Sequence, residues 1–559
     1  MAVAHPLILI IFVWFCTGFL SQDDINKSVI ILNYFVTYIQ VIVPLKLDWE
    51  PYYSVPEGVE VAPGERVSVI FSGKEYVAVV SKTNAAPGDS LNAGKIHPII
   101  DKVTDLPPFT ELEISYWRKL AQYYMCTVGE VYNSVYFRDQ KPPRKWVAKE
   151  WETPRIPSDG GKTLLLESSP GEDRTTYYLE KAAEVIAEGR STLLLVPEIA
   201  LTRQLEQRVA SVFPEMRLYH SALTPAKRRD VVLEARSGKP MLVVGTRSAL
   251  FIPFKCLGLI IVEQEHDPTF KQESPAPRYY AREASIMLAS LYGARVILGS
   301  PTPSLESQYN VETGLFTKVE LKENFTNSKS PEITIIDTAA ERRKRGMVGD
   351  ISLKLLALAK ETVDDGSRVL AVSWKEDVQI PGADIVTPSA VKNMQVDAYG
   401  LIAVLEADMM LGRQDFRSDE RALQLLRRLG ASCPLVIQTK EPGHPVFRAL
   451  EQRDSGIYAS MLEERRQFGY PPFTRLVLIQ LKDYDTDRQG LRSRLLGNRI
   501  REAVRPFSDP LVLGPEQGEL RVFFKRDRNL AKGKEALYRE VSSFQSQYSC
   551  HITIDVDPA

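Results

Sequence analysis

The stretch "LLLESSPGEDRTTYYLEKAAEVI", Leu164 to Ile186, decides the fold of the central part of this chain. An apolar run typical of a buried strand leads into a Ser, Pro and Gly loop, and a segment of good helix formers follows. A strand, a turn and a helix N-terminus in this order form the phosphate-binding loop of many nucleotide-binding domains. This loop, however, lacks the lysine and the flanking glycine that such a site uses.

Short apolar runs recur on both sides of the loop at the spacing of alternating strands and helices. Between Thr163 and about Glu320 they are "TLLLE", "STLLLVPEI", "RLYHS", "PMLVVGT", "GLIIVEQ" and "RVILGSP". They read as buried parallel strands and predict a doubly wound α/β domain with ligand loops at the carboxyl ends of its strands. A second, weaker alternation from about Pro331 predicts a smaller lobe of the same class.

The flanking regions predict three further modules. Gly and Pro turns between short alternating runs favour a small β domain, and two short helical patterns after it are spaced like a compact winged helix. A linker rich in Pro and charge, Arg138 to Lys162, precedes the central domain. The predicted multidomain α/β architecture therefore has these parts: an apolar N-terminal extension at 1–40, a β domain at 41–105, a winged-helix-like module at 106–150, a first lobe at 151–330, a reduced second lobe at 331–452 and an α+β domain at 453–559.

Composition excludes several classes of protein. The 559 residues are 44% hydrophobic, so a disordered or fibrous chain is not indicated. The 70 Lys and Arg residues nearly balance the 71 Asp and Glu residues, whereas a protein that coats DNA indiscriminately is usually more basic. Nucleic-acid contacts must therefore come from local patches. Five scattered cysteines without a C-x-x-C pair signal neither a zinc site nor a disulfide framework, and they fit a reducing cytoplasm.

The N-terminus carries a different signal. "PLILIIFVWFCTGFL", Pro6 to Leu20, is apolar, but no Lys or Arg precedes it. It is also shorter than the roughly 20 residues that a membrane span needs. Three interpretations stay open: a membrane anchor, a cleaved signal, or residues upstream of the native start. We expect a cytoplasmic protein, with membrane association the less favoured outcome.

Several segments, taken in order, match one family. They are "LLLVPEIALT" (193–202), "VVGTRSALFIPF" (243–254), "LGLIIVEQEHD" (257–267), "LGSPTPSLES" (298–307), "QDFRSDERALQLL" (414–426), "ERRQFGYPPFTRLVLI" (464–479) and the terminal "DVDP" (555–558). From about Val41 to Ala559 the chain resembles the primosomal protein N′ family, the PriA replication-restart DNA helicases. "GTRSALF" together with "GYPPF" and "DVDP" is not a general ATPase pattern.

The resemblance implies a function and an architecture. Members of the family recognise stalled replication forks, unwind duplex with 3′ to 5′ polarity using ATP and Mg²⁺, and help to reload the replicative helicase. The implied partners are forked or single-stranded DNA and the primosome and helicase-loading proteins. The implied parts are a 3′-end-binding domain, a winged helix, two RecA-like lobes with a zinc module in the second, and a C-terminal domain.

The family's phosphate loop falls on residues 168–175, so the resemblance implies Gly171, Arg174 and Thr175 as the ATP-binding residues. Arg174 replaces the family lysine, and a planar guanidinium is not equivalent to a compact ammonium. Glu172 and Asp173 place two negative charges where phosphates would sit. The alternative interpretation is that these acids only complement the helix dipole. We expect a loop that no longer turns ATP over.

The family's acidic box falls on "VEQEHD". Glu263 takes the place of the magnesium-associated aspartate and Gln264 that of the water-activating glutamate. Glutamine cannot accept a proton at neutral pH, so general-base help worth about 10²–10⁴-fold is lost. These two residues are the candidate catalytic residues of a degenerate site.

The second lobe departs from the family pattern as well. Ala431 and Ser432 stand where a Gly-Arg step is expected, and Arg427 and Arg428 lie nearby but out of register. The zinc module is missing between about Trp374 and Ala383, so no zinc is predicted.

Residues that would touch DNA are better retained. The resemblance implies that Thr202, Thr246 and Arg247 line the single-strand path, although Arg247 could instead serve a structural salt bridge. The loop "DPTFKQESPAPRYYARE" mixes aromatic and basic residues in a way suited to base stacking, although aromatic clusters are more often core. Its candidate DNA-binding residues are Phe270, Lys271, Tyr279 and Tyr280. Two basic runs, 341–346 and 525–534, are either solvated faces or phosphate contacts.

The sequence thus predicts a replication-restart protein that binds branched DNA and whose motor is impaired, so whether it is an enzyme stays open. The first alternative is an active ATP-dependent 3′ to 5′ helicase in which Arg174 and Glu263 substitute adequately. The second is a membrane-associated protein or a non-functional fragment.

Overall fold

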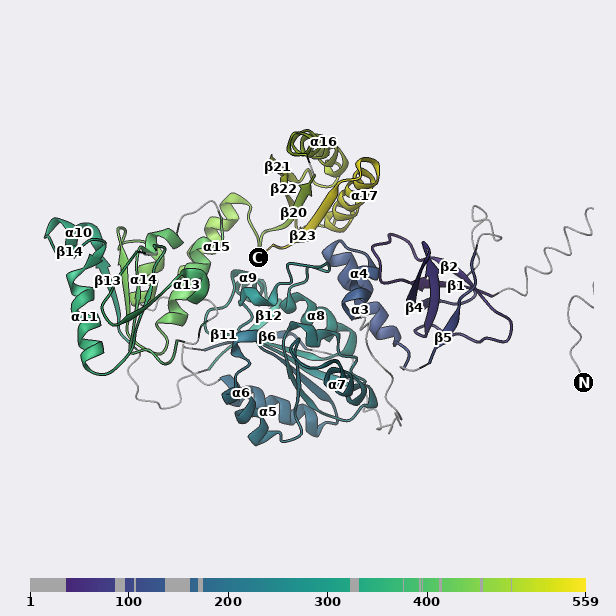
Figure 1. Cartoon of the computed structure of the whole chain (residues 1–559), viewed down its shortest axis with the longest axis horizontal. Helices are drawn as coiled ribbons and strands as arrows, with labels where there is room; N and C mark the ends of the chain where they lie inside the picture. Colours follow the sequence, from purple (N-terminus) through teal and green to yellow (C-terminus); the bar gives the residue numbers. More distant parts are fainter. Residues whose placement is uncertain are drawn as a thin grey trace, which may run out of the picture. The chain divides into compact units, whose positions relative to one another are not determined.

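The computed structural model describes residues 37–85, 96–104, 107–135, 161–168, 174–321, 331–375, 377–391, 394, 396–411, 415–452, 456–483 and 485–558. Residues 1–36 of the predicted N-terminal extension, and most of the predicted linker, lie outside this set. The chain forms two compact units (Figure 1). Unit 1 is Met1–Ala121 with Cys126–Trp146, and unit 2 is Gln122–Met125 with Val147–Ala559.

Unit 1 contains an antiparallel sheet of order β2-β1-β4-β3-β5. Its strands are β1 (Thr37–Ile42), β2 (Tyr52–Val55), β3 (Arg66–Phe71), β4 (Lys74–Lys82) and β5 (Asp101–Val103), and the helices α3 (Glu111–Tyr124) and α4 (Val128–Val135) follow. Ser72 and Gly73 join β3 to β4 with φ of 47° and 76°, the left-handed geometry that a two-residue hairpin loop requires. Alternating Val67, Val69 and Val80 fill the core of the sheet. The strands and the two helices predicted for this region are present.

The first α/β lobe of unit 2 has a seven-stranded, entirely parallel sheet of order β12-β6-β11-β10-β7-β9-β8. Its strands are β6 (Thr163–Glu167), β7 (Ser191–Leu195), β8 (Arg217–Tyr219), β9 (Leu242–Gly245), β10 (Leu257–Glu263), β11 (Arg295–Ser300) and β12 (Phe316–Glu320). The helices between them are α5 (Arg174–Ala187), α6 (Arg203–Val212), α7 (Pro225–Ser237), α8 (Ala281–Tyr292) and α9 (Leu305–Glu312). Helices α5 and α6 lie on one side of the sheet and α8 and α9 on the other (Figure 1), which confirms the doubly wound fold class.

The second lobe is also a parallel sheet, of order β13-β19-β18-β16-β17. Its strands are β13 (Ile333–Asp337), β16 (Val369–Val372), β17 (Ala383–Val386), β18 (Leu401–Val404) and β19 (Leu435–Thr439). A small hairpin joins β14 (Met347–Val348) to β15 (Ile351–Ser352). The helices are α10 (Thr338–Arg343), α11 (Leu353–Asp364), α12 (Pro388–Val391), α13 (Ser418–Leu429), α14 (Pro445–Gln452) and α15 (Ile457–Phe468).

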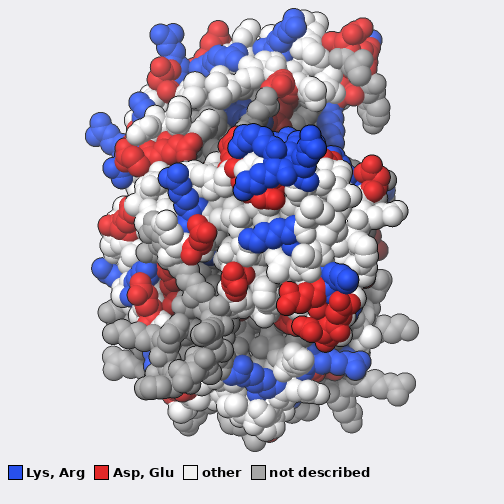
Figure 2. Space-filling view, turned by 90° about the vertical axis from the view of Figure 1, so that its left-hand side faces the viewer, with Lys and Arg blue, Asp and Glu red and all other residues white. Residues whose placement is uncertain are grey.

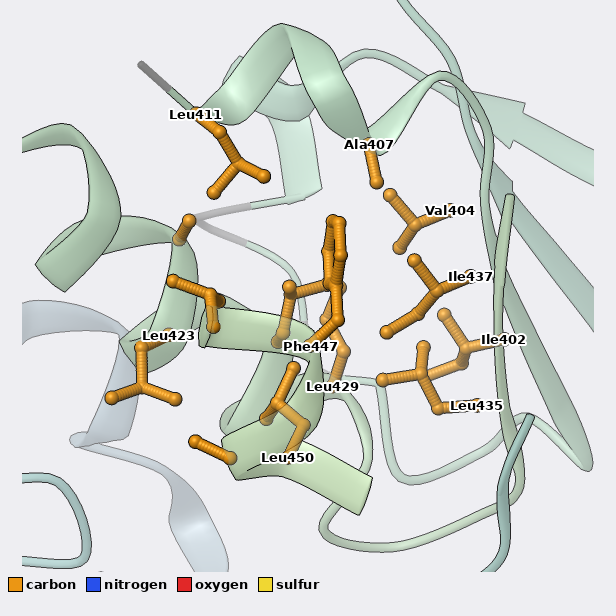
Figure 3. Close-up of a cluster of buried hydrophobic side chains, with 14 of the residues drawn as sticks. Ile402, Val404, Ala407, Leu411, Leu423, Leu429, Leu435, Ile437, Phe447 and Leu450 are labelled. Atoms are coloured by element: carbon orange, nitrogen blue, oxygen red, sulfur yellow. The ribbon is translucent and has the colours of Figure 1, made fainter. Parts of the chain in front are cut away.

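The smaller size of the second lobe does not leave it without a core. Ile402 and Ile437 from the sheet face Leu423, Phe447 and Leu450 from α13 and α14, and all five are buried (Figure 3). Burial of such side chains contributes about 1.5–3 kcal/mol each relative to exposure. The lobe is therefore a packed α/β layer structure in its own right.

The C-terminal part is the predicted α+β structure. Its antiparallel sheet has the order β21-β22-β20-β23, with β20 (Thr474–Lys482), β21 (Leu511–Glu516), β22 (Glu519–Lys525) and β23 (His551–Val556). The helices α16 (Thr486–Val504) and α17 (Leu530–Tyr548) pack against each other and contact its strands. Within the described ranges of the whole chain, no helix combines the length and the apolar character needed to cross a bilayer.

Candidate nucleotide site

The sequence-predicted phosphate loop lies between β6 and α5. Helix α5 begins at Arg174, so the predicted order of strand, loop and helix is present. Gly171, together with the rest of 169–173, falls outside the described residues. Thr175 is half-buried in the first turn of α5. In the parallel sheet, β11 pairs with both β6 and β10, which brings the carboxyl end of β10 near the start of α5.

Arg174 and Glu263, predicted for phosphate and for magnesium, are bound to each other. The Nε of Arg174 donates to Oε2 of Glu263 at 3.0 Å and to Oε1 at 3.2 Å, and its Nη2 also contacts Oε1. The side chains are only 11% and 17% exposed. Burial alone would lower the pKa of Arg174, but the Glu263 carboxylate more than offsets this and raises the pKa. The pair is thus a bidentate, poorly solvated ion pair.

Two further side chains complete this cluster. Tyr178 donates its hydroxyl to Oε2 of Glu263 at 2.6 Å, and Nη1 of Arg174 donates to the hydroxyl of Ser168. Burial, followed by the charge of Glu263, raises the pKa of Tyr178 well above its ordinary value, so its hydroxyl remains a donor. Tyr178 also fills the space above Gly299, because a Cβ added there would overlap its hydroxyl oxygen.

The closed cluster has a chemical consequence. A phosphate can be bound by Arg174 only if the guanidinium releases Glu263, and a metal can be bound by Glu263 only if the carboxylate releases Arg174 and Tyr178. The residues present therefore do not fit Mg²⁺ and ATP as they are arranged. Among the described residues, no group of three or more His, Cys, Asp or Glu side chains is placed to hold a metal ion.

The remainder of the acidic box makes contacts within the first lobe. Gln264 follows β10 in a left-handed turn with φ of 55°, and its carbonyl accepts the Asp267 N–H at 2.8 Å. His266 Nδ1 lies 2.7 Å from the hydroxyl of Ser300. Burial lowers the pKa of His266, which favours a neutral imidazole at neutral pH. These contacts hold the end of β10 against the end of β11.

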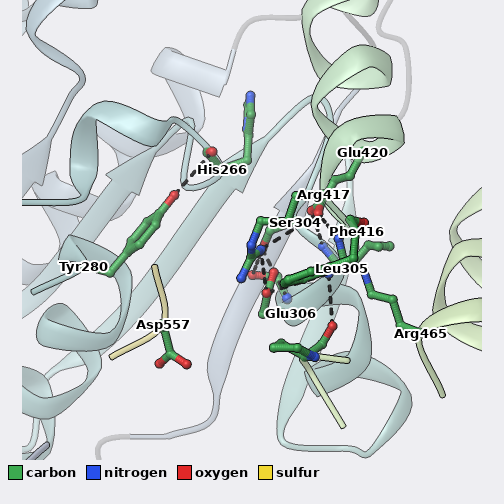
Figure 4. Close-up of polar contacts among 12 residues, drawn as sticks. His266, Tyr280, Ser304, Leu305, Glu306, Phe416, Arg417, Glu420, Arg465 and Asp557 are labelled. Atoms are coloured by element: carbon green, nitrogen blue, oxygen red, sulfur yellow. Dashed lines mark hydrogen bonds and ion pairs between the residues drawn. The ribbon is translucent and has the colours of Figure 1, made fainter. Parts of the chain in front are cut away.

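Sequence reasoning missed a buried polar network that joins the two lobes (Figure 4). Glu265, which has no exposed surface, accepts the Ser304 N–H at 2.7 Å at the start of α9. Glu420 of α13, in the other lobe, accepts the next N–H, that of Leu305, at 2.9 Å. Arg465 pairs with Glu420 at 2.5 Å. Carboxylates are favoured at a helix N-terminus. Glu265 of the first lobe and Glu420 of the second therefore both stabilise the start of α9. The acidic "DFRSDER" pattern was the available signal.

The two arginines near the expected finger position are bound within the second lobe. Arg428 donates from Nη2 to the carbonyls of Val391 at 2.6 Å and Met394 at 3.0 Å. Arg427 donates to the Tyr458 hydroxyl at 3.0 Å. In this arrangement both guanidinium groups bind partners of their own lobe.

The residues predicted to line a DNA path occupy different environments. Thr202 caps α6 by accepting the Leu205 N–H at 3.2 Å, and Thr246 is buried. Arg247, in the 3₁₀ turn η3 (Arg247–Phe251), donates from Nη1 to the carbonyls of Thr269 at 2.8 Å and Lys271 at 2.6 Å. Arg247 thus fastens the aromatic loop through backbone carbonyls, and its contact with DNA stays a prediction.

The aromatic loop itself is largely buried. Phe270 and Tyr279 are each 1% exposed, so in this structure they present no ring face to a base. Lys271 pairs with Asp555 at 2.7 Å and donates to the Val556 carbonyl at 2.8 Å. Tyr280 is half-buried and donates to a backbone carbonyl. The core interpretation of these rings agrees with their burial, and DNA contact by this loop stays a prediction.

Both basic runs are largely at the surface. In the first, residues 342–345 at the end of α10 are all exposed, and Arg342 pairs with Asp350 at 3.2 Å. The face of unit 2 shown in Figure 2 carries a compact group of Lys and Arg with Asp and Glu beside it. In the second run, Lys525, Arg526, Arg528 and Lys532 are exposed.

Part of the chain matches a known domain family. Residues 40–136 match the family described as the 3′DNA-binding domain (3′BD) of PriA. The matched range contains nearly all of the sheet of unit 1 and both helices that follow it, so the helices predicted as a separate winged-helix module belong to the matched range.

Curated proteins named replication restart protein PriA are similar over longer ranges. The protein of Rickettsia felis is 23% identical over 643 aligned positions, which cover 90% of this chain and 97% of that protein. The protein of Bacillus subtilis is 26% identical, covering 64% of this chain and 58% of that protein. The protein of Chlamydia pneumoniae is 37% identical, covering 56% and 57%. These matches confirm the resemblance to PriA.

Solved structures show only a distant likeness. RecG bound to a three-way DNA junction aligns with a TM-score of 0.35 and 12% identity, covering 65% of this chain and 50% of that one. The DUF1998 helicase MrfA bound to DNA and AMPPNP gives a TM-score of 0.33 and 12% identity, covering 54% and 48%. Similarity at this level does not bear on function.

Proposed function

We propose that this chain, a relative of the PriA replication restart proteins, is itself a replication restart protein that binds branched or forked DNA and turns over little or no ATP. The observation that carries DNA binding is the match of residues 40–136 to the PriA 3′DNA-binding domain. These residues form a sheet and two helices with a core of their own.

The internal ion pair of the nucleotide site supports the second half of the proposal. Freeing Arg174 for a phosphate leaves Glu263 buried without a cation, and breaking a buried pair in this way costs about 3–5 kcal/mol. A nucleotide must supply that free energy before it gains any net affinity. In addition, Gln264 cannot act as a general base at neutral pH, which removes the usual help to the attacking water.

Further parts of the proposal rest on the resemblance alone. ATP and Mg²⁺ are the ligands that the resemblance to the family implies. Proteins of the primosome and of replicative-helicase loading are the implied partners. We place the protein in the cytoplasm, where its DNA substrate is, and the free thiols of Cys433 and Cys550 suit that compartment.

One observation favours an active ATP-dependent 3′ to 5′ helicase as the second candidate. The opposite charges of Arg174 and Glu263 are retained and lie in contact at the carboxyl edge of the parallel sheet, the edge at which ligands bind in such folds. If nucleotide separates the pair at low cost, the two side chains regain phosphate and metal contacts. DNA-stimulated hydrolysis distinguishes the two candidates.

The proposed DNA binding is tested with the full chain and fluorescent oligonucleotides of equal length. A fork whose leading strand ends with a 3′-hydroxyl at the branch is compared with linear duplex and with the same fork carrying a 3′-phosphate. We expect the fork with the free 3′ end to bind most tightly, and the preference to persist without nucleotide. Equal affinity for all three DNAs would contradict the proposal, because a 3′-end-binding domain would then contribute nothing.

A further inference from the structure

A set of aromatic rings outside the nucleotide site reaches the surface where α15 ends. Phe468, the last residue of α15, is 65% exposed, which is unusual for so large an apolar side chain. It precedes the "GYPPF" segment that leads into β20. Neither the nucleotide site nor the interlobe network uses it.

The neighbouring rings form an ordered stack. Tyr470 stacks on Phe416, with ring centroids 4.8 Å apart and planes inclined by 12°. The Phe468 ring is tilted by 31° against Tyr470 at 6.2 Å. Phe523 of β22 packs against Tyr470 at 6.0 Å. The exposed Phe468 ring therefore stands at the open end of an aromatic series that draws its rings from α15, from β22 and from the segments before α13 and after α15.

Positive charge lies beside this stack. Lys525 follows Phe523 by two residues on β22, so it projects from the same face of the strand as the ring that packs on Tyr470. Arg526 and Pro471, the residue after Tyr470, line one cavity of about 490 Å³. Arg528 and Lys532 continue the basic run into the start of α17.

These cations are available for a ligand. Among the residues that the structure describes, Lys525, Arg526, Arg528 and Lys532 have no carboxylate at ion-pair distance, and all four are exposed. The one acid within the run, Asp527, accepts the Asn529 N–H at 2.8 Å and a bond from Ser508. Within the described ranges, ion pairs with neighbouring side chains therefore do not neutralise the run.

We propose that Phe468, Tyr470 and the basic run at residues 525–532 form a binding site for single-stranded DNA in unit 2. Bases stack on the exposed ring and extend the aromatic series, and phosphates bind the four cations. Aromatic platforms beside available cations suit single strands, because every base has a π-face and every nucleotide a charge. An apolar protein partner would use the rings but would leave the four cations without a role. The site deepens the proposed function, on which it rests, and is separate from the domain at 40–136.

The test uses the full chain and a circular single strand, which has no 3′ end and therefore bypasses a 3′-end-binding domain. We expect Phe468→Ala to weaken binding on the order of tenfold, because one base loses its stacking partner. Phe468→Tyr should bind like the wild type, whereas Phe468→Leu, which keeps apolar bulk without a π-face, should bind like Phe468→Ala. Leu491→Ala on α16, at an equally exposed apolar position (70%), is the matched control and should change nothing.

The charges are tested through salt dependence. Removing one phosphate-binding cation should make the slope of log affinity against log salt less steep by about 0.7 for a single strand. We expect Lys525→Gln with Arg528→Gln to reduce the slope accordingly. A strand carrying 5-iododeoxyuridine should crosslink at Phe468 or Tyr470. Wild-type binding of the circle by all the variants, or crosslinks only elsewhere, would overturn this site. Retained affinity in Phe468→Leu would show that base stacking on this ring is not needed for binding, and it would equally overturn the site.

The two proposals fail in different ways. If the wild type shows no preference for the fork with a free 3′ end, the proposed function fails whatever the circular strand does. If that preference holds but the Phe468 and Lys525 variants bind the circular strand as tightly as the wild type, the site in unit 2 fails and the proposed function stands.

Discussion

The ion pair at the nucleotide site makes a quantitative prediction for Glu263→Gln. The change keeps the shape of the side chain and removes its charge. Arg174, whose side chain is only 11% exposed, then remains buried with no carboxylate to balance it. Removing one partner of a buried pair costs about 3–5 kcal/mol, and we expect the lower figure because the site retains some solvent contact. The destabilisation should therefore be about 3 kcal/mol.

Native-state amide hydrogen exchange measures this locally in a chain of several domains. Amides of β10 and α5 should exchange about 10²-fold faster in Glu263→Gln, since 1.36 kcal/mol corresponds to a factor of ten. Removing both charges, as in Arg174→Met with Glu263→Gln, should restore most of the protection, because no unbalanced charge is then left buried.

A matched control lies on the same helix. Lys181 and Glu184 of α5 pair at 2.7 Å, but their side chains are 32% and 47% exposed. Glu184→Gln should cost about 0.5 kcal/mol or less, as solvent screens such pairs. If Glu263→Gln costs no more than Glu184→Gln, the pair at the nucleotide site is solvated and does not hold the site closed.

Two other positions give independent predictions. Gly299→Ala should destabilise the first lobe by about 1–3 kcal/mol, because its Cβ would meet the Tyr178 hydroxyl, and adding Tyr178→Phe should recover part of the stability in chemical denaturation. Burial would raise the pKa of Glu306, but Arg417 and Arg465 hold it well below its ordinary 4.5, so its stabilising effect is present above about pH 4.5 and is lost as the pH falls below it. Glu306→Gln should therefore flatten the acid side of the stability profile followed by circular dichroism, and an unchanged profile would contradict the assignment.

The fold was predictable from the sequence because its signals are local. Runs such as "GLIIVEQ" and "RVILGSP" are apolar over the length of one strand, and they became β10 and β11 of the parallel sheet. The order of strand, loop and helix around Arg174 was visible for the same reason. A packed core in the second lobe did not follow from the sequence, since the weak alternation there does not show which faces pack together.

The internal contacts of the site were not predictable, since they join distant positions. Arg174 and Glu263 are 89 residues apart. The sequence shows the two opposite charges but does not show that they form an ion pair with each other. Lys271 binds a carbonyl 285 residues away. That remote partner buries a loop whose polar, proline-bearing sequence suggested exposure, and Phe270 and Tyr279 are buried with it. Glu420 likewise accepts the N–H of Leu305, a residue 115 positions earlier in the chain.

Steady-state ATP hydrolysis by the purified full chain, with and without forked DNA, shows whether the pair of Arg174 and Glu263 keeps the nucleotide site closed. Arg174→Ala, which cannot contact phosphate, sets the background. We expect the wild type to hydrolyse no more ATP than this variant while it still binds forks. DNA-stimulated turnover that Arg174→Ala abolishes would show instead that the ion pair opens to admit nucleotide and that the motor is active.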